Sequence, residues 1–164
     1  MNAKVKKLTL SAIVLALYVV IMAMTQGFAF GQYQIRIATA LYALAALYPF
    51  LIVPLGLGNL ISNMLLGGLG ALDMAGGFIV GMVTSGIIVW MRSRKLPDWT
   101  LALPIIFGPG LLVPIWLSVL IHVPYAVLVA SLIVGQIVPG VAGVVLLKQL
   151  EGWQEKEGKR VYGI

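Results

Sequence analysis

The stretch IATALYALAALYPFLIVPLGLGNLISNMLLGGLGALDMAGGFIVGMVTSGIIVWM, residues 37–91, decides the fold. It contains a single charged side chain, Asp73. A transmembrane helix needs about 20 mainly apolar residues, so this stretch is too long for two spans and about right for three. Pro49 and Pro54 indicate one turn within it, and the run Gly67-Gly68-Leu69-Gly70 indicates the next.

Three further apolar segments flank this stretch and bring the predicted number of spans to six. The predicted spans are Leu8–Met24, Ile37–Tyr48, Leu51–Leu66, Leu72–Met91, Trp99–Ile121 and Tyr125–Leu147. The expected fold class is therefore all-α: a polytopic membrane protein, a six-transmembrane-helix bundle over residues 1–147 with a cytoplasmic polar tail over residues 148–164. The second span is short, so it either tilts little or begins inside the preceding polar stretch, Thr25–Arg36.

The composition excludes most other classes of protein. The chain is 61% hydrophobic and 10% charged, whereas soluble domains carry about 25% charged residues. The net charge of +6 does not indicate nucleic-acid binding, because the cations stand at the ends of apolar runs, as topology signals do. With no cysteine and only His122, the sequence offers no disulfide, iron–sulfur cluster or histidine metal site. Hydrolase and nucleotide-binding motifs are missing too, so we expect no enzyme activity, metal or cofactor.

The distribution of Lys and Arg predicts the orientation in the membrane. With the N-terminus in the cytoplasm, ten of the eleven Lys and Arg lie inside and only Arg36 lies outside. An even number of spans returns the C-terminus to the cytoplasm. We therefore expect a multi-pass protein of a bacterial inner membrane, in contact with membrane lipid. The first segment follows three lysines, as in a signal peptide, but it is long for one and lacks the cleavage pattern, so we expect it to be retained.

Two charged residues are the first candidates for a binding site, because ionisable groups in hydrocarbon are costly. Asp73 either binds a ligand in a pocket or stabilises the start of a helix. Arg36 either pairs with Asp73, binds an anionic or carbonyl group, or extends to the membrane interface.

Amide and aromatic side chains extend this candidate site. Asn63 follows Asn59 by about one helical turn, and it either binds a ligand or hydrogen-bonds another helix. Trp116 and Tyr125 either stack on a planar ligand or anchor the chain at the membrane interface.

Glycine and proline indicate irregular backbone in the last two spans. Gln136 lies in Gly135-Gln136-Ile137-Val138-Pro139-Gly140, which favours a bent helix beside a cavity. The fifth span carries Pro104, Pro109 and Pro114, which indicates either an interrupted span beside a binding site or a kink.

The first span carries a small-xxx-small pair, Ala12 and Ala16, which lets another helix approach closely. The sequence has no internal repeat of the kind with which many transporters build two halves around a site. A chain of this size without a repeat requires either oligomerisation or partners that supply part of the mechanism.

The sequence resembles a known family at three places. They are Gln34–Leu41, Asn63 and the run Gly67-Gly68-Leu69-Gly70-Ala71-Leu72-Asp73. The chain is similar, from its first helix to its sixth, to the substrate-binding S components of energy-coupling factor (ECF) transporters, specifically the queuosine-precursor (QueT-like) group. The resemblance implies a six-helix bundle that binds a vitamin-like molecule from outside and docks on a coupling transmembrane subunit and two ATPase subunits. It also implies that Ala12 and Ala16 dock the coupling subunit and that Thr25–Arg36 covers the pocket.

The chain departs from that group at Thr39 and Gln136, where the group usually has glutamate, and it lacks the Asn that the group tends to carry near Gly108. The aminomethyl form of 7-deazaguanine carries a cation, and a dry pocket needs a counter-charge for it. Asp73 remains, and a carboxylate suits the donor edge of a guanine-like ring. We therefore expect a neutral ligand: the cyano precursor, queuine or another planar heterocycle. The expected ligand-binding residues are Arg36, Thr39, Asn63, Asp73, Trp116 and Gln136.

Three other functions stay open at this level. They are an S component for a different small nutrient, a stand-alone membrane carrier or channel, and an assembly subunit without a ligand. Co-purification of a coupling protein and ATPases favours an S component, and saturable binding excludes a subunit without a ligand.

Overall fold

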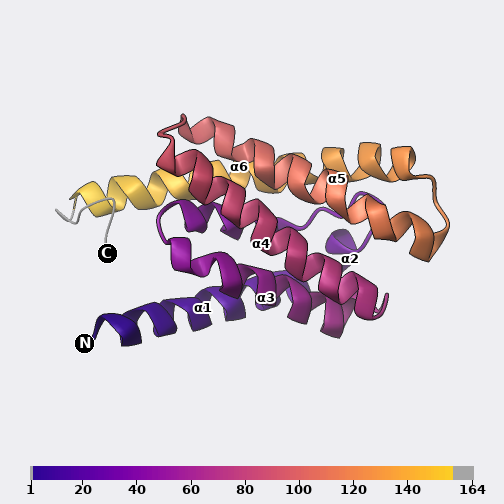
Figure 1. Cartoon of the computed structure of the whole chain (residues 1–164), viewed down its shortest axis with the longest axis horizontal. Coiled ribbons are helices and arrows are strands. Elements are labelled where there is room, and N and C mark those ends of the chain that lie inside the picture. The colour runs from indigo at the N-terminus through magenta and orange to yellow at the C-terminus, as the bar shows by residue number, and fades with distance from the viewer. Residues whose placement is uncertain (1, 157–164) are drawn as a thin grey trace.

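The computed structural model describes residues 2–156 and contains only helices as regular elements in that range (Figure 1). Five stretches are long and apolar enough to cross a membrane: Ala3–Met24, Pro49–Gly67, Ala71–Ser93, Asp98–Ile121 and Tyr125–Lys156. The predicted all-α membrane bundle is thus confirmed. In chain order the elements are α1 (Ala3–Met24), α2 (Gln26–Ala29), η1 (Ile37–Ala46), η2 (Pro49–Leu51), α3 (Ile52–Ser62), η3 (Asn63–Gly67), α4 (Ala71–Ser93), η4 (Asp98–Leu101), α5 (Ala102–Ile121) and α6 (Tyr125–Lys156).

The second predicted span, Ile37–Tyr48, is the one whose type of helix differs from the prediction. Over Ile37–Ala46 the chain forms a 3₁₀-helix of ten residues, η1, instead of a transmembrane α-helix. At about 2 Å of rise per residue it covers about 20 Å, less than the roughly 30 Å of a hydrocarbon core. Every residue from Ala38 to Ala46 is buried. Irregular backbone at membrane depth is tolerated where protein surrounds it, as it does here.

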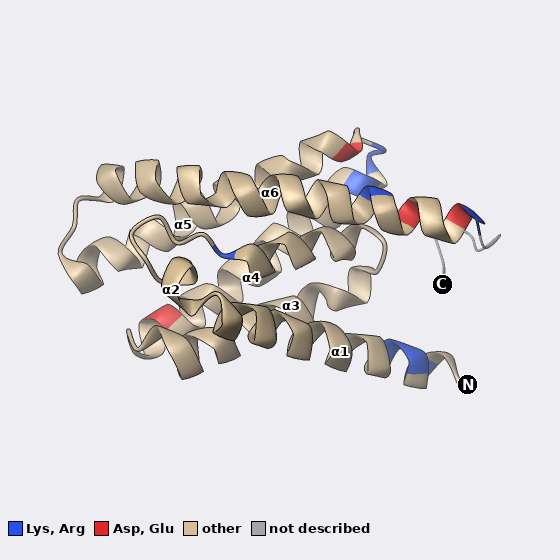
Figure 2. Cartoon of the chain, turned by 180° about the vertical axis from the view of Figure 1, so that it is seen from behind, with Lys and Arg blue, Asp and Glu red and all other residues tan. Residues whose placement is uncertain are grey.

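The chain runs back and forth along one axis, and its charges gather at one end. The start of α1 and the end of α6 lie at the same end of the bundle (Figure 1). Figure 2 shows most Lys and Arg at this end, one cation within the bundle and one acid toward the opposite end. By the positive-inside rule, we expect the end that holds the cations to face the cytoplasm and the opposite end to face outward.

The fifth span is continuous. Pro109 and Pro114 lie inside α5, which runs from Ala102 to Ile121 without a break, so of the two alternatives the interrupted span does not hold. A proline inside a membrane helix is tolerated when the neighbouring helices satisfy the backbone groups that it frees.

The sixth span is longer than predicted, because α6 continues past Leu147 to Lys156. On this extension the Gln154 amide donates a hydrogen bond of 2.7 Å to the Tyr48 hydroxyl. Arg92 forms ion pairs with Asp98, at 2.6 Å, and with Glu151. The first part of the predicted tail therefore packs on the bundle, and residues 157–164 lie outside the described part of the chain.

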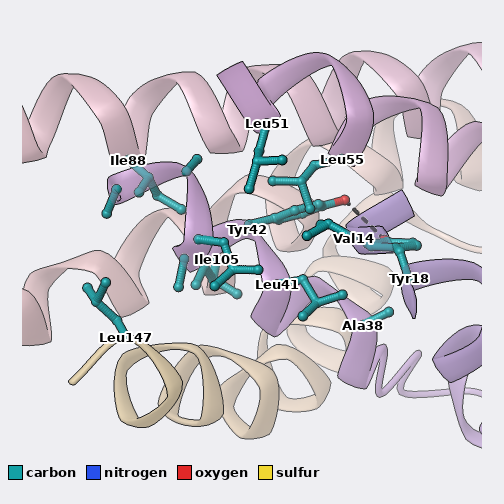
Figure 3. Close-up of a cluster of buried hydrophobic side chains, with 14 of the residues drawn as sticks. Val14, Tyr18, Ala38, Leu41, Tyr42, Leu51, Leu55, Ile88, Ile105 and Leu147 are labelled. Atoms are coloured by element: carbon teal, nitrogen blue, oxygen red, sulfur yellow. Dashed lines mark hydrogen bonds between the residues drawn. The ribbon is translucent and has the colours of Figure 1, made fainter. Parts of the chain in front are cut away.

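The largest apolar core surrounds η1 (Figure 3). Leu41 and Tyr42 of η1 pack with side chains from the flanking helices, among them Val14, Tyr18, Leu51, Leu55, Ile88, Ile105 and Leu147. The rings of Tyr18 and Tyr42 stack with their centroids 5.9 Å apart, and their hydroxyls lie 3.2 Å apart. This core places η1 at the centre of the bundle, and with it the residues that flank it.

Glycines bring α3 and α4 into close contact, as small residues do between membrane helices. A Cβ on Gly81 of α4 would lie 2.8 Å from the Cα of Gly56 on α3. Because the obstructing atom belongs to the backbone, a methyl group at residue 81 would force the two helices apart.

We predict that Gly81→Ala lowers the free energy of unfolding by about 1–3 kcal/mol, the usual cost of overpacking. Gly86→Ala is the matched control, since it lies on the same helix and a Cβ there meets nothing within 4 Å. The control should leave stability unchanged or raise it by up to about 1 kcal/mol. Thermal unfolding in detergent, followed by tryptophan fluorescence, measures both, and equal melting temperatures for the two variants would contradict the packing described here.

Candidate ligand-binding site

A buried arginine is the centre of a polar network between η1, α3 and α4. Arg36 is 3% exposed, so it does not extend to the membrane interface as one reading of the sequence allowed. Its Nη1 donates to the Oδ1 atoms of Asn59, at 3.2 Å, and Asn63, at 3.1 Å. Within residues 2–156 no carboxylate oxygen lies within 4.0 Å of the guanidinium, so the alternative in which Arg36 pairs with Asp73 does not hold either. Its Nε has no hydrogen-bond partner.

The second charge of the network is Asp73, which lies in the first turn of α4 and is 2% exposed. Its Oδ1 accepts a hydrogen bond of 3.0 Å from the Trp116 indole, and its backbone carbonyl accepts one of 3.0 Å from the Asn63 amide. Its Oδ2 has no partner. The N-cap residue of α4 is Gly70, so Asp73 does not act as the cap, although the positive end of the helix dipole favours a carboxylate there.

Asn63 joins the two charges, because it accepts from Arg36 and donates to the backbone of Asp73. Asn59 extends the network inward, because its amide donates a hydrogen bond of 2.8 Å to the Tyr42 hydroxyl. The Tyr42 hydroxyl lies beside that of Tyr18. The structure thus brings together Arg36, Asn63, Asp73 and Trp116, four of the six residues that the sequence singled out as ligand-binding.

Two adjacent glycines on α4 make room for this network. A Cβ on Gly77 would lie 2.6 Å from the Asn63 amide nitrogen and 2.7 Å from the Asn59 amide oxygen. A Cβ on Gly76 would lie 2.6 Å from the ring of Trp116. Neither glycine is among the residues predicted from the sequence, although paired glycines inside an apolar helix indicate that something packs closely against it.

Thr39 and Gln136 form a second buried group. The Thr39 hydroxyl lies 2.9 Å from Oε1 of Gln136 and 2.7 Å from the backbone carbonyl of Arg36. The Gln136 amide donates a hydrogen bond of 2.8 Å to the backbone carbonyl of Gln34. These hydrogen bonds tie the segment before η1 to α6, so both side chains hold the backbone around Arg36 in place.

A cavity of about 470 Å³ lies beside the network. Its lining includes Phe30 and Gln34 from the segment before η1, Gly67 from η3, and apolar side chains of α5 and α6 such as Leu117 and Leu132. None of the six predicted residues lines it. Phe30 and Gly67 stand between the cavity and the network, since the Phe30 ring lies over Arg36 and Oδ2 of Asp73 would lie 3.3 Å from a Cβ on Gly67.

A second cavity, of about 630 Å³, lies at the end of the bundle that holds the cations. Its lining includes Arg92, Lys95 and Asp98, where Arg92 and Asp98 already form an ion pair. Ligand cavities combine an apolar lining with a few convergent polar groups. The cavity of about 470 Å³ is the one next to the network, because its lining residue Phe30 lies over Arg36 and its lining residue Gly67 lies beside Asp73.

The remaining predicted residues lie away from the network. The Tyr125 hydroxyl donates a hydrogen bond of 3.0 Å to the backbone carbonyl of Leu111. On α1, Val14 and Tyr18 face the bundle, whereas Ala12 and Ala16 are exposed on the opposite side.

Comparison with known proteins gives one match. A family model described as QueT transporter matches residues 8–152, which is most of the chain and includes every element of the network. No match was found among curated proteins or among solved structures. The family resemblance seen in the sequence is thereby confirmed, together with the multi-pass membrane character of the chain. The chain belongs to the QueT transporter family, a family of membrane transporters.

Proposed function

We propose that this protein is the substrate-binding S component of an ATP-driven ECF-type importer in a bacterial inner membrane. Its substrate is a 7-deazaguanine precursor of queuosine or a related neutral planar heterocycle. Family membership supports transport of a small molecule. The observation that carries the proposal is the buried pair Arg36 and Asp73, each with one unpartnered polar atom, bridged by Asn63 beside a cavity.

The chemistry of the two free atoms supports a ligand with both a donor and an acceptor edge. Arg36 Nε is a donor that needs an acceptor, and Asp73 Oδ2 is an acceptor that needs a donor. A guanine-like ring offers a carbonyl oxygen and, on the same edge, ring and exocyclic N–H groups. It would satisfy both atoms together and remove the cost of two buried polar groups without partners.

The charges of the site support a neutral ligand. Arg36 and Asp73 contribute one positive and one negative charge, and Thr39 and Gln136 contribute none. The other acids of the chain are Asp98, Glu151, Glu155 and Glu157, and those that the structure describes lie toward the end that holds the cations (Figure 2). A cationic ligand would thus leave an excess positive charge in a site of low dielectric constant.

The energy for transport would come from partners, a coupling transmembrane subunit and two ATPase subunits. The sequence contains no nucleotide-binding motif of its own. Ala12 and Ala16 form an exposed small-residue surface on α1, the membrane helix with the smallest buried share, where another helix can approach closely. We propose that this surface docks the coupling subunit.

We predict that the purified protein binds 7-cyano-7-deazaguanine and binds the cationic 7-aminomethyl form at least about tenfold more weakly. Asp73→Asn should weaken binding of the cyano form by about 10- to 100-fold, since a hydrogen bond to a charged group contributes about 1.5–3 kcal/mol. Asp98→Asn makes the same change at the other end of the bundle and serves as the control. Calorimetric titration in detergent measures all of these. Tighter binding of the aminomethyl form would refute the neutral ligand, and equal effects of the two substitutions would remove Asp73 from the site.

We also predict that replacing Ala12 and Ala16 together with leucine abolishes co-purification of the coupling subunit and the ATPases, because bulky side chains prevent close helix contact. Ligand binding should be unchanged. The double change of Ala126 and Ala130 to leucine is the matched control, since these residues form an exposed pair with the same spacing on α6. Loss of ligand binding in the α1 variant would place this surface in the bundle core, and retention of the complex would show that docking uses another surface.

A further inference from the structure

The ring of Phe30 lies over one charged residue of the proposed site, Arg36, and close to Gly67, which also lies beside the other charged residue, Asp73. The guanidinium carbon of Arg36 is 4.9 Å from the ring centroid, within the range of a cation–π contact. Both this ring and the Asp73 carboxylate lie close to Gly67, since a Cβ there would be 3.1 Å from Cε1 of Phe30 and 3.3 Å from Oδ2 of Asp73. The ring is thus a flat aromatic group that turns its face toward the arginine, near the glycine that the carboxylate also approaches.

This ring fills space but satisfies neither charged group fully. A phenyl face attracts the guanidinium, yet it offers no acceptor to Nε and no donor to Oδ2, and both atoms remain without partners. A planar heterocycle in the same place would offer both. The arrangement is therefore the one expected of a group that stands in for the ligand and binds less well than the ligand does.

The ring of Phe30 is only partly buried, and it packs against the apolar core around η1 without being enclosed in it. Phe30 is the C-cap of α2, a helix of only four residues. This helix is anchored by hydrogen bonds on either side of Phe30, from the Gln26 amide to the Leu66 carbonyl at 3.3 Å and from the Ile35 backbone N–H to the Phe28 carbonyl at 3.0 Å. The ring also lines the cavity of about 470 Å³, which has room for a displaced side chain.

We infer that Phe30 is a specificity-determining residue that competes with the substrate. It occupies the substrate's place over Arg36 in the unliganded protein, and a ligand enters by displacing it toward the cavity. A ligand that lacks either the acceptor for Arg36 or the donors for Asp73 gains too little to displace the ring. This inference rests on the proposed function, because it assigns the substrate the position that the ring now holds.

The test compares Phe30→Ala with Phe28→Ala. Phe28 lies on the same short helix and is 70% exposed, so its removal controls for loss of a phenyl ring from α2. Both changes are made in a protein that keeps Trp116 as its only tryptophan, with Trp90, Trp99 and Trp153 replaced by phenylalanine. Phe30→Leu is the second variant, which keeps apolar volume but has no aromatic face.

Two measurements are made on each protein. The first is acrylamide quenching of Trp116 without ligand, which should rise in Phe30→Ala because the ring no longer covers the site. The second is binding of 7-cyano-7-deazaguanine. Suppose that the Phe30 ring has left Arg36 in about one tenth of the unliganded molecules, and that only these bind the ligand. Phe30→Ala should then bind about tenfold more tightly, mainly through faster association. Phe30→Leu should lie between this variant and its parent, and Phe28→Ala should match the parent in both measurements.

The outcomes separate the inference from the proposed function. Weaker binding in both Phe30 variants overturns the inference, because Phe30 would then be a wall that stacks on the ligand. Unchanged quenching together with unchanged binding also overturns it. If the parent binds no ligand, the proposed function fails, and quenching alone then decides whether Phe30 covers the network around Arg36.

Discussion

A guanidinium buried without a carboxylate beside it is the constraint on which the rest of the structure depends. Taking Arg36 out of water is costly, and one hydrogen-bonded face toward Asn59 and Asn63 offsets this cost only in part. Asp73, held by the same asparagine, has a corresponding unpartnered oxygen. We propose that the protein keeps two such groups within a membrane bundle for a ligand that satisfies both.

The position of Arg36 depends on η1, which is a short 3₁₀-helix instead of a transmembrane α-helix. If the chain crossed at Ile37 as an ordinary α-helix, Arg36 would lie near a membrane surface, where it could extend into water. Because η1 is a short 3₁₀-helix buried on all sides, the residue before it is buried too. Thr39 and Gln136 then fix the backbone around it. The glycines of α4 complete the arrangement, since side chains at residues 76 and 77 would occupy the space of Trp116 and of the two asparagines.

Much of the fold and of the candidate site was predictable from the sequence. There are physical reasons why the rest was not. Hydropathy located α1, α3, α4, α5 and α6, and the cost of polar groups in hydrocarbon singled out Arg36, Asn63 and Asp73. Apolar composition alone does not distinguish a 3₁₀-helix from an α-helix, so the nature of η1 was missed. The extension of α6 carries an ion pair of Glu151 with Arg92, a contact between residues far apart in the chain that the sequence does not reveal. Phe30 was not among the predicted site residues, because an aromatic residue in a loop does not indicate a role in binding until its neighbours are known.

The most direct test of the central claim is an experimental structure of the protein with 7-cyano-7-deazaguanine bound. We expect the heterocycle to lie over Arg36, with ligand atoms about 2.7–3.2 Å from Nε of Arg36 and Oδ2 of Asp73, and Phe30 to have moved away. A ligand bound elsewhere, for example in the cavity beside Arg92 and Asp98, with Phe30 still over Arg36, would contradict this expectation.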